Sequence, residues 1–244
     1  MKKQAKILTS GLILFFVLGF SGTPAGAQWR GTSGSGNVVR ETRDLRDFNQ
    51  ITVGGAFDLY VTMGNEWQVE VVADDNLIGH IQTHLNGKTL RIRMEPGTNI
   101  RRYKELKVYV TLPAIDKLTA SGASTVVFRN AVRQPALALS ASGSSDIKLQ
   151  VRVDELKVNT SGASDIHIEG YAAYAEVVAS GSSDFRGSQF ECTAALVTLS
   201  GSSDMRAIIT RSVTGTLSGS SDLHIAGGNP EIKVKTSGSS RVRR

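Results

Sequence analysis

The sequence predicts an all-β protein, built as a right-handed parallel β-helix of about 20-residue coils with an N-terminal strand-rich module that contains one short helix. The first observation behind this prediction is a Ser-Gly-x-Ser motif that recurs seven times. The second is an alternation of apolar and polar residues on both sides of each motif. The seven motif glycines are 18 to 21 residues apart, at Gly122, Gly143, Gly162, Gly181, Gly201, Gly219 and Gly238.

The alternation around each glycine predicts two strands per repeat. Apolar residues lie two, four and six positions before Gly143 and four and six positions after it, and the residues between them are mostly polar. Because side chains of a strand alternate between two faces, each strand has one inward face. A unit this short cannot bury that face alone, so it must stack on copies of itself. Crossovers between parallel strands are almost always right-handed, which gives the expected hand.

The N-terminal residues 1–27 have the pattern of an export signal. Three lysines precede an apolar stretch over residues 7–20, and Ala25-Gly26-Ala27 supplies the small residues of a cleavage site before Gln28. The apolar stretch is short for a membrane span. We therefore expect an exported protein with no transmembrane segment after signal cleavage, placed in the periplasm, on the cell surface or outside the cell.

Three further regions follow the signal. Residues 28–36 are rich in Gly and Ser and are expected to form a flexible leader. Residues 37–112 form the N-terminal strand-rich module, and residues 113–244 carry the repeats. We expect the repeats to continue from the module as one domain.

The module contains strand-like runs separated by turn residues. These runs cover residues 51–53, 57–62, 67–72, 89–94 and 105–112. Between the third and fourth runs, Asp74-Asp75-Asn76 offers an N-cap, and Leu77, Ile78, Ile81 and Leu85 recur at helical spacing. The sequence therefore predicts one helix that ends at Asn86-Gly87.

Two histidines of the predicted helix, His80 and His84, are four residues apart and would share one face. That spacing occurs in zinc-binding helices, but no Glu stands between them, so we interpret them as surface residues. The protein's one cysteine, Cys192, lies among small apolar residues and cannot form an intramolecular disulfide. We expect it to be a buried small hydrophobe, because free cysteines are among the most buried residues.

The charge balance argues against nucleic acid as a partner. The formal net charge is +6, and loss of the three signal lysines leaves +3. No basic stripe with interleaved aromatic residues is present. A mild positive charge on an exported protein is weak evidence for nucleic-acid binding.

Five aspartates recur three residues after their motif glycines. They are Asp146, Asp165, Asp184, Asp204 and Asp222. Stacked coils would bring them about 4.8 Å apart in an outward row, where each adjacent pair repels by up to about 1 kcal/mol. Basic residues two positions further along would balance this row, and they are Lys148, His167, Arg186, Arg206 and His224. Serines beside the glycines should form parallel hydroxyl rows.

We expect the aspartates to accept hydrogen bonds from turn N–H and serine O–H groups, as Asx motifs do. The alternative is a row that binds Ca²⁺, although the period and the glycine placement differ from the known calcium-binding repeat. No other metal or cofactor is expected. A special site should be sought where the repeat breaks, at Thr125, at Gly187, at Tyr171 to Tyr174 or in the N-terminal module.

Three parts of the chain carry a family resemblance. The first is Gly36-Asn37-Val38-Val39 followed by Phe48, Ile51, Gly55 and Asp58-Leu59-Tyr60-Val61. The second is Ala73-Asp74-Asp75-Asn76-Leu77 with Asn86-Gly87-Lys88-Thr89-Leu90. The third is the series of Ser-Gly-Ser-Ser-Asp motifs. The chain resembles the putative auto-transporter adhesin, head GIN domain family of exported bacterial proteins. This resemblance implies a β-helical fold and a surface or periplasmic location, and it implies no established activity.

The leading functional hypothesis is a non-enzymatic adhesin or surface-binding module. Its candidate ligand-binding residues are the five aspartates together with Tyr171 and Tyr174, whose exposed rings could stack on sugars. Expected partners are glycans or proteins of the cell surface and envelope, and copies of the chain associated through the ends or faces of the β-helix. One alternative is a polysaccharide lyase or hydrolase that uses pairs of these carboxylates. The other is a purely structural envelope protein.

Overall fold

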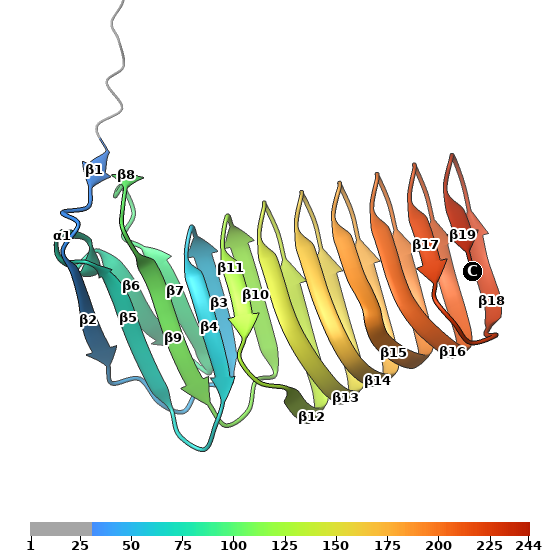
Figure 1. Cartoon of the computed structure of the whole chain (residues 1–244), viewed down its shortest axis with the longest axis horizontal. Helices are drawn as coiled ribbons and strands as arrows, with labels where there is room; N and C mark the ends of the chain where they lie inside the picture. Colours follow the sequence, from blue (N-terminus) through green and yellow to red (C-terminus); the bar gives the residue numbers. More distant parts are fainter. Residues whose placement is uncertain (1–30) are drawn as a thin grey trace, which may run out of the picture. The chain divides into compact units, whose positions relative to one another are not determined.

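The chain winds into a parallel β-helix of about seven coils, as the repeat predicts (Figure 1). The computed structural model describes residues 31–244, which form one compact unit. The expected export signal over residues 1–27 lies outside the described residues. No helix among residues 31–244 is long and apolar enough to cross a bilayer.

Strands make up 66% of the described chain and helix 2%. The N-terminal elements are β1 (Thr32–Ser33), β2 (Val38–Arg43), β3 (Gln50–Gly55), β4 (Asp58–Met63), β5 (Gln68–Asp74), α1 (Asp75–Ile78), β6 (Ile81–Asn86), β7 (Thr89–Met94), β8 (Ile100–Arg102) and β9 (Leu106–Leu112). The repeat elements are β10 (Lys117–Gly122), β11 (Thr125–Phe128), β12 (Val132–Ala141), β13 (Asp146–Thr160), β14 (Asp165–Ala179), β15 (Asp184–Leu199), β16 (Asp204–Leu217), β17 (Asp222–Ile225), β18 (Glu231–Thr236) and β19 (Arg241–Arg243).

Successive coils pair in parallel at a nearly constant offset. Asp146 of β13 pairs with Asp165 of β14, and at the far end of the same strands Thr160 pairs with Ala179, both 19 residues apart. The seven motif glycines stand at the corners between strands and have φ values from 71° to 81°. Only glycine takes up this left-handed region at no steric cost, so the motif turns the chain at the same point of every coil.

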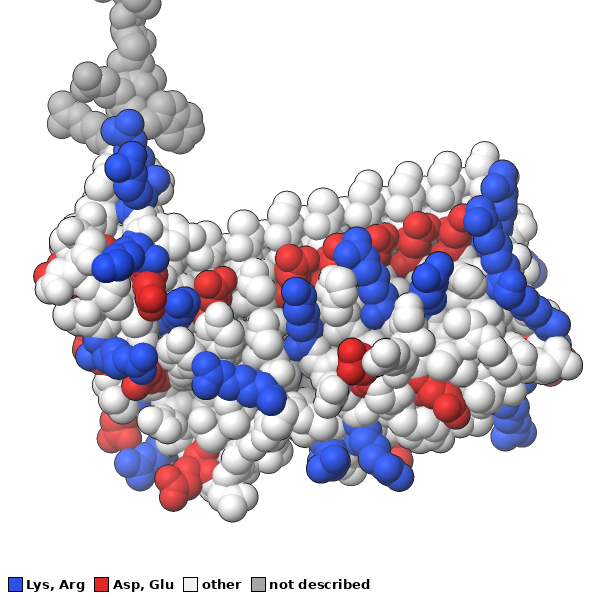
Figure 2. All heavy atoms as spheres, viewed as in Figure 1, with Lys and Arg blue, Asp and Glu red and all other residues white. Residues whose placement is uncertain are grey.

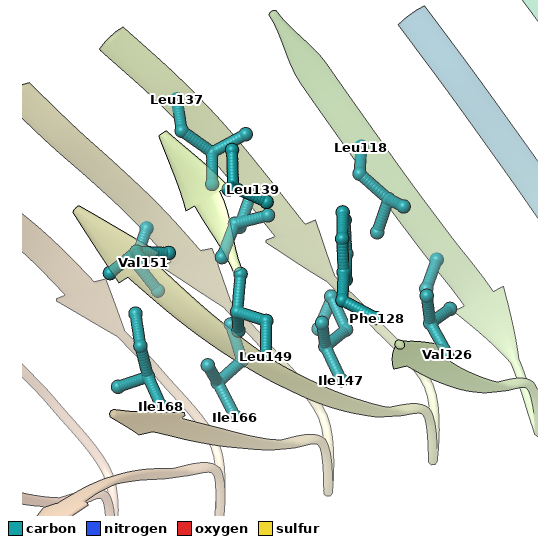
Figure 3. Close-up of a cluster of buried hydrophobic side chains, with 14 of the residues drawn as sticks. Leu118, Val126, Phe128, Leu137, Leu139, Ile147, Leu149, Val151, Ile166 and Ile168 are labelled. Atoms are coloured by element: carbon teal, nitrogen blue, oxygen red, sulfur yellow. The ribbon is translucent and has the colours of Figure 1, made fainter. Parts of the chain in front are cut away.

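The core lies inside the coils and consists of the alternating apolar residues. The inward positions that flank Gly143, among them Leu139 and Ile147, are buried, and so are their counterparts in the next coil. Figure 3 shows leucine, isoleucine and valine side chains from neighbouring coils packed in register. Stacking identical positions gives each inward side chain an apolar neighbour above and below it. This arrangement explains why the two-residue period recurs in each repeat.

The N-terminal module closes one end of the stack. Its β3 and β4 pair in parallel with β10 and β11, and β7 and β9 pair in parallel with β3 and β4 on the other side. Beyond them, β5 runs antiparallel to both β9 and β2. The module therefore begins the β-helix, and its corner at Gly55 stacks beneath Gly122.

The predicted helix over residues 77–85 is wrong beyond its first turn. Helix α1 covers only Asp75–Ile78, and β6 continues as a strand antiparallel to β7. Asn86-Gly87 does not end a helix but opens a tight hairpin turn, with Gly87 at φ 59°. His80 and His84 consequently share no helix face. His80 lies in the turn after α1, where its Nδ1 is 2.8 Å from Glu95 Oε2.

The described part of the expected flexible leader is attached to the module. In β1, Thr32 pairs with Ile100 of β8. The backbone N–H of Gly36 donates to Asp74 Oδ1 at 2.6 Å, and that carboxylate is fully buried. Gly34 packs so close that a Cβ atom would lie 2.6 Å from Asp74 Cγ. The small residues of this segment thus allow close approach to a buried acceptor.

Candidate ligand-binding face

The five aspartates form a continuous outward row, as stacking predicts. Figure 2 shows this row as a red band along one face, with basic side chains beside it. Register extends the row in both directions beyond the motif aspartates. Its members in order are Lys107, Asp58, Thr125, Asp146, Asp165, Asp184, Asp204, Asp222 and Arg241. A cation therefore stands at each end of the acidic row.

Arginines of the adjacent row neutralise part of this charge. Arg186 Nη2 lies 2.9 Å from Asp165 Oδ2 and 3.0 Å from Asp184 Oδ2, so one guanidinium bridges two coils. The hydrogen bond from Arg186 to Asp184 raises the pKa of the guanidinium above its usual value. At the last coil, Arg243 Nη2 lies 3.0 Å from Asp222 Oδ2. These contacts support the expected charge balance between the two rows.

The expected hydrogen bonds from turn groups to the aspartates are largely wrong. Among residues 31–244, Asp204 is the one row aspartate that accepts a backbone N–H, from Asp222 at 3.1 Å, and none accepts a serine hydroxyl. The inner serine of each motif closes the turn instead. Ser164 Oγ donates to the Ser161 carbonyl at 3.0 Å, and every other motif repeats this bond. The aspartates are thereby left facing their neighbours and the arginines.

A second outward row runs two residues beyond the aspartates. Its members in order are Tyr109, Tyr60, Val127, Lys148, His167, Arg186, Arg206, His224 and Arg243. A groove of about 700 Å³ lies along its middle part. Lys148, His167 and Arg186 line the groove, together with Arg129, Gln150 and Glu169. The groove thus crosses several coils at right angles to the strands.

Two stacked tyrosines hold Arg129, which lines one end of this groove. The rings of Tyr60 and Tyr109 are 5.1 Å apart and nearly parallel. Arg129 Cζ lies 5.0 Å from the first ring centroid and 4.8 Å from the second, within the range of a cation–π interaction. Because the two tyrosines come from β4 and β9, the N-terminal module positions an arginine that lines the groove.

A break in the repeat at Gly187 shapes the other end. The pairing of β14 with β15 shifts by one residue between His167 and Glu169. A Cβ atom at Gly187 would lie 2.8 Å from Phe185 Cε1, so the Phe185 ring fills the space of the missing side chain. Ser188 follows as the extra residue and lines both the groove and a pocket of about 360 Å³ beside it. The smaller pocket contains Asp184, Asp204 and Asp222 with the arginines opposite them.

Tyr171 and Tyr174 are exposed, each at 37% of its surface, but they do not join the aspartate row. Tyr171 is six residues beyond Asp165 and follows the bend at Gly170, so the two lie at most about 20 Å apart. Its hydroxyl pairs with Thr193 Oγ1 at 3.0 Å, and its ring lines a shallow hollow with Arg133 and Arg152. The structure thus separates the predicted site residues into two groups.

Metal and thiol chemistry find little support in residues 31–244. No three His, Cys, Asp or Glu side chains of this region converge to hold a metal ion. Cys192 is fully buried, as expected, and burial raises the pKa of its thiol to about 12. A nucleophilic thiol needs a lowered pKa and access to solvent, and Cys192 has neither.

Comparisons with known proteins agree with this architecture. The model of the family described as "Putative auto-transporter adhesin, head GIN domain" matches residues 47–230. A putative adhesin from Bacteroides fragilis is 19% identical, with a TM-score of 0.79, over 87% of this chain and 99% of that one. A putative lipid binding protein from Parabacteroides distasonis is 18% identical, with a TM-score of 0.74, over 88% and 99%. A putative adhesin from Parabacteroides merdae is 16% identical, with a TM-score of 0.72, over 87% and 98%. A comparison with curated proteins found no match.

Proposed function

Because the chain belongs to the putative auto-transporter adhesin, head GIN domain family, we propose that it is an exported, non-enzymatic binding protein that recognises a surface glycan polymer. The observation that carries this proposal is the face made by the acidic row, the basic row and the groove. The five coils from Asp146 to Asp222 each present a carboxylate and, two residues further on, a Lys, His or Arg side chain, so this part of the face offers similar contacts at regular intervals. A polymer with repeating units can use such contacts together, which strengthens weak individual interactions.

The lining of the groove supports a polar ligand over an acyl chain. Charged and amide side chains such as Lys148, Gln150 and Glu169 lie around the space. The apolar residues that also line it are Phe128, Leu149 and Ile168, and all three are buried. Sugar hydroxyls both donate and accept hydrogen bonds, and this mixture of side chains can serve both roles. We therefore propose a glycan ligand, although one structural neighbour is described as a putative lipid binding protein.

The carboxylates of the face support binding over catalysis. Glycoside hydrolysis requires two carboxyl groups in unlike environments, one of which keeps its proton. Asp165 and Asp184 instead occupy equivalent positions on neighbouring coils and share one guanidinium. The acidic groups are the repeating element of this face rather than a departure from it.

The proposal can be tested by measuring how the purified protein binds a glycan array and isolated cell envelopes. Ser188→Trp is the informative variant, because Ser188 is exposed in the groove and the large ring would obstruct part of it. Ser144→Trp is its matched control at an exposed corner. Loss of binding in the first variant alone supports the proposed face.

Three other results would count against the proposal. Absence of binding to every glycan and envelope tested leaves a structural role as the better account. Binding that is unchanged by Ser188→Trp moves the site away from this face. Release of shortened or unsaturated sugar products would identify an enzyme instead.

A further inference from the structure

The groove carries more positive than negative charge. Arg129, Lys148 and Arg186 are permanent cations at its lining, His167 lies between two of them, and Glu169 is the one carboxylate that lines it. The aspartate row lies beside the groove, but none of its members lines it. A ligand in the groove therefore meets a local excess of cations.

Two of these cations are not engaged by carboxylates of the described chain. The ion pairs of residues 31–244 include Arg186 but neither Arg129 nor Lys148. Both side chains belong to exposed residues. Arg129 is also held in place by the rings of Tyr60 and Tyr109. A guanidinium that is already ordered loses less conformational freedom when it binds an anion.

The remaining groups favour an acidic sugar over a nucleic acid. Gln150 Nε2 donates to Glu169 Oε2 at 3.0 Å. The amide oxygen of Gln150 and the other carboxylate oxygen of Glu169 can then accept hydrogen bonds from sugar hydroxyl groups. Proteins that bind single-stranded nucleic acid stack its bases on free aromatic faces. The tyrosines nearest this groove, Tyr60 and Tyr109, are stacked on each other, and Arg129 lies against both rings. These two rings are therefore already engaged with each other and with a cation.

The aspartate row makes the two sides of the groove different in charge. Carboxylates of a ligand are attracted to Lys148 and Arg129 and repelled by Asp146 and its neighbours, so they are directed to one side of the polymer axis. Repulsion of this kind contributes to specificity as much as attraction does. We infer that the groove is a subsite for the carboxylates of an acidic polysaccharide, an inference that rests on the proposed glycan-binding function.

The test compares polygalacturonate with its methyl ester, which has the same backbone but no charge. Affinity is measured for both polymers at fixed ionic strength with the unaltered protein. We expect binding of polygalacturonate to be at least tenfold tighter than binding of the ester, a difference of about 1.4 kcal/mol.

Variants at one position separate the groove from general charge effects. Lys148→Gln should weaken polygalacturonate binding about tenfold, and Lys148→Arg should retain it. Lys157→Gln is the matched control, because Lys157 lies on the same strand and does not line the groove. It should leave the affinity unchanged.

Each contrary result has a distinct meaning. Equal binding of acid and ester overturns the carboxylate subsite but leaves glycan binding in place. Equal weakening by Lys148→Gln and Lys157→Gln identifies non-specific charge attraction and overturns the inference. Binding of an oligothymidylate that shows the same dependence on Lys148 also overturns it. Failure to bind either polymer, with envelope binding intact, rejects the subsite without rejecting the proposed function.

Discussion

Gly143 stacks directly on Gly122, so closely that a Cβ atom on Gly143 would lie 2.6 Å from the Gly122 carbonyl oxygen. The same approach recurs at each later motif, up to Gly238 on Gly219. These positions need glycine for two reasons, the left-handed φ and the close backbone of the preceding coil. The corners are therefore tightly constrained points of the fold.

Replacement of a corner glycine should be strongly destabilising. We expect Gly143→Ala to lower the free energy of unfolding by about 3 kcal/mol, through backbone strain and displacement of the neighbouring coil. Gly79→Ala is the control, since Gly79 has φ −67° and no atom within 4 Å of an added Cβ. It should change stability by less than about 0.5 kcal/mol in urea unfolding. Equal effects of the two substitutions would show that the corner can accommodate a methyl side chain.

The inner serine of the motif should matter more than the outer one. Ser164→Ala removes the bond to the Ser161 carbonyl, and we expect a loss of about 1 kcal/mol. Ser182→Ala, at an exposed outer position, should be neutral, because the chain itself has Ala123 and Ala163 at equivalent places. Thermal unfolding of the two variants checks this difference, and a larger effect of Ser182→Ala would contradict the assigned hydrogen bond.

Asp74 should make the N-terminal module sensitive to acid. A hydrogen bond from the Lys104 backbone N–H at 2.8 Å, aided by that from Gly36, holds the pKa of Asp74 below its ordinary value of 3.8, although burial opposes this. A lowered folded-state pKa adds stability that is complete above the unfolded value and is lost as pH falls through the folded one.

We expect Asp74→Asn to cost about 2 kcal/mol at pH 7, because an amide has only one acceptor oxygen for the two N–H groups. The difference from the unaltered protein should shrink as the pH is lowered below 3.8. Urea unfolding at several pH values measures it. Asp44→Asn, at a carboxylate that is 83% exposed, should have no effect at either end of the range. A constant deficit for Asp74→Asn at all pH values would argue against a charged Asp74.

Arg186 should hold the two neighbouring aspartates together mainly at low salt. Arg186→Gln leaves Asp165 and Asp184 about 4.8 Å apart with no cation between them, so we expect a loss of up to about 1 kcal/mol. High salt screens the exposed charges and should reduce this loss. Arg152→Gln, outside the described ion pairs, is the control. Melting temperatures at two salt concentrations test the prediction, and a salt-independent loss would point to packing instead.

Cys192 should be inert in the folded protein. Its thiol is buried and has a pKa of about 12, so almost no thiolate exists at pH 8. We expect no labelling by a thiol reagent under native conditions and complete labelling in urea. Rapid labelling of the folded protein would show that this part of β15 opens easily.

The strands and corners of the repeats could be predicted from sequence because both depend on local patterns. The helix prediction failed for a related reason. Ile81 and Leu85 are four residues apart, a spacing that fits one helix face and equally fits one strand face. Asn-Gly likewise ends helices and also forms hairpin turns. The hairpin of β6 with β7 decides between the two structures, and β7 is held in the sheet by its pairing with β3, which is distant in the chain.

The corner at Gly55 was missed because Phe57 occupies the place of the inner serine. The available signal was Asp58, three residues after Gly55, with Leu59 and Val61 at the inward spacing.

The groove could not be predicted from the sequence for a different reason. It depends on Arg129 meeting Tyr60 and Tyr109, which come together because β9 pairs with one side of β4 and β11 pairs with the other.

The constant offset between coils makes the length of this protein adjustable. Loss of residues 162–180 would join Ser161 to Gly181 and restore an intact Ser-Gly-Ser-Ser-Asp motif. Gain of one such segment would extend the face by about 4.8 Å. Recombination between repeats could therefore lengthen or shorten the β-helix by whole coils. The corner motif would then have a second role, because its repeated sequence supplies matching sites at which the coding region can recombine without breaking a coil.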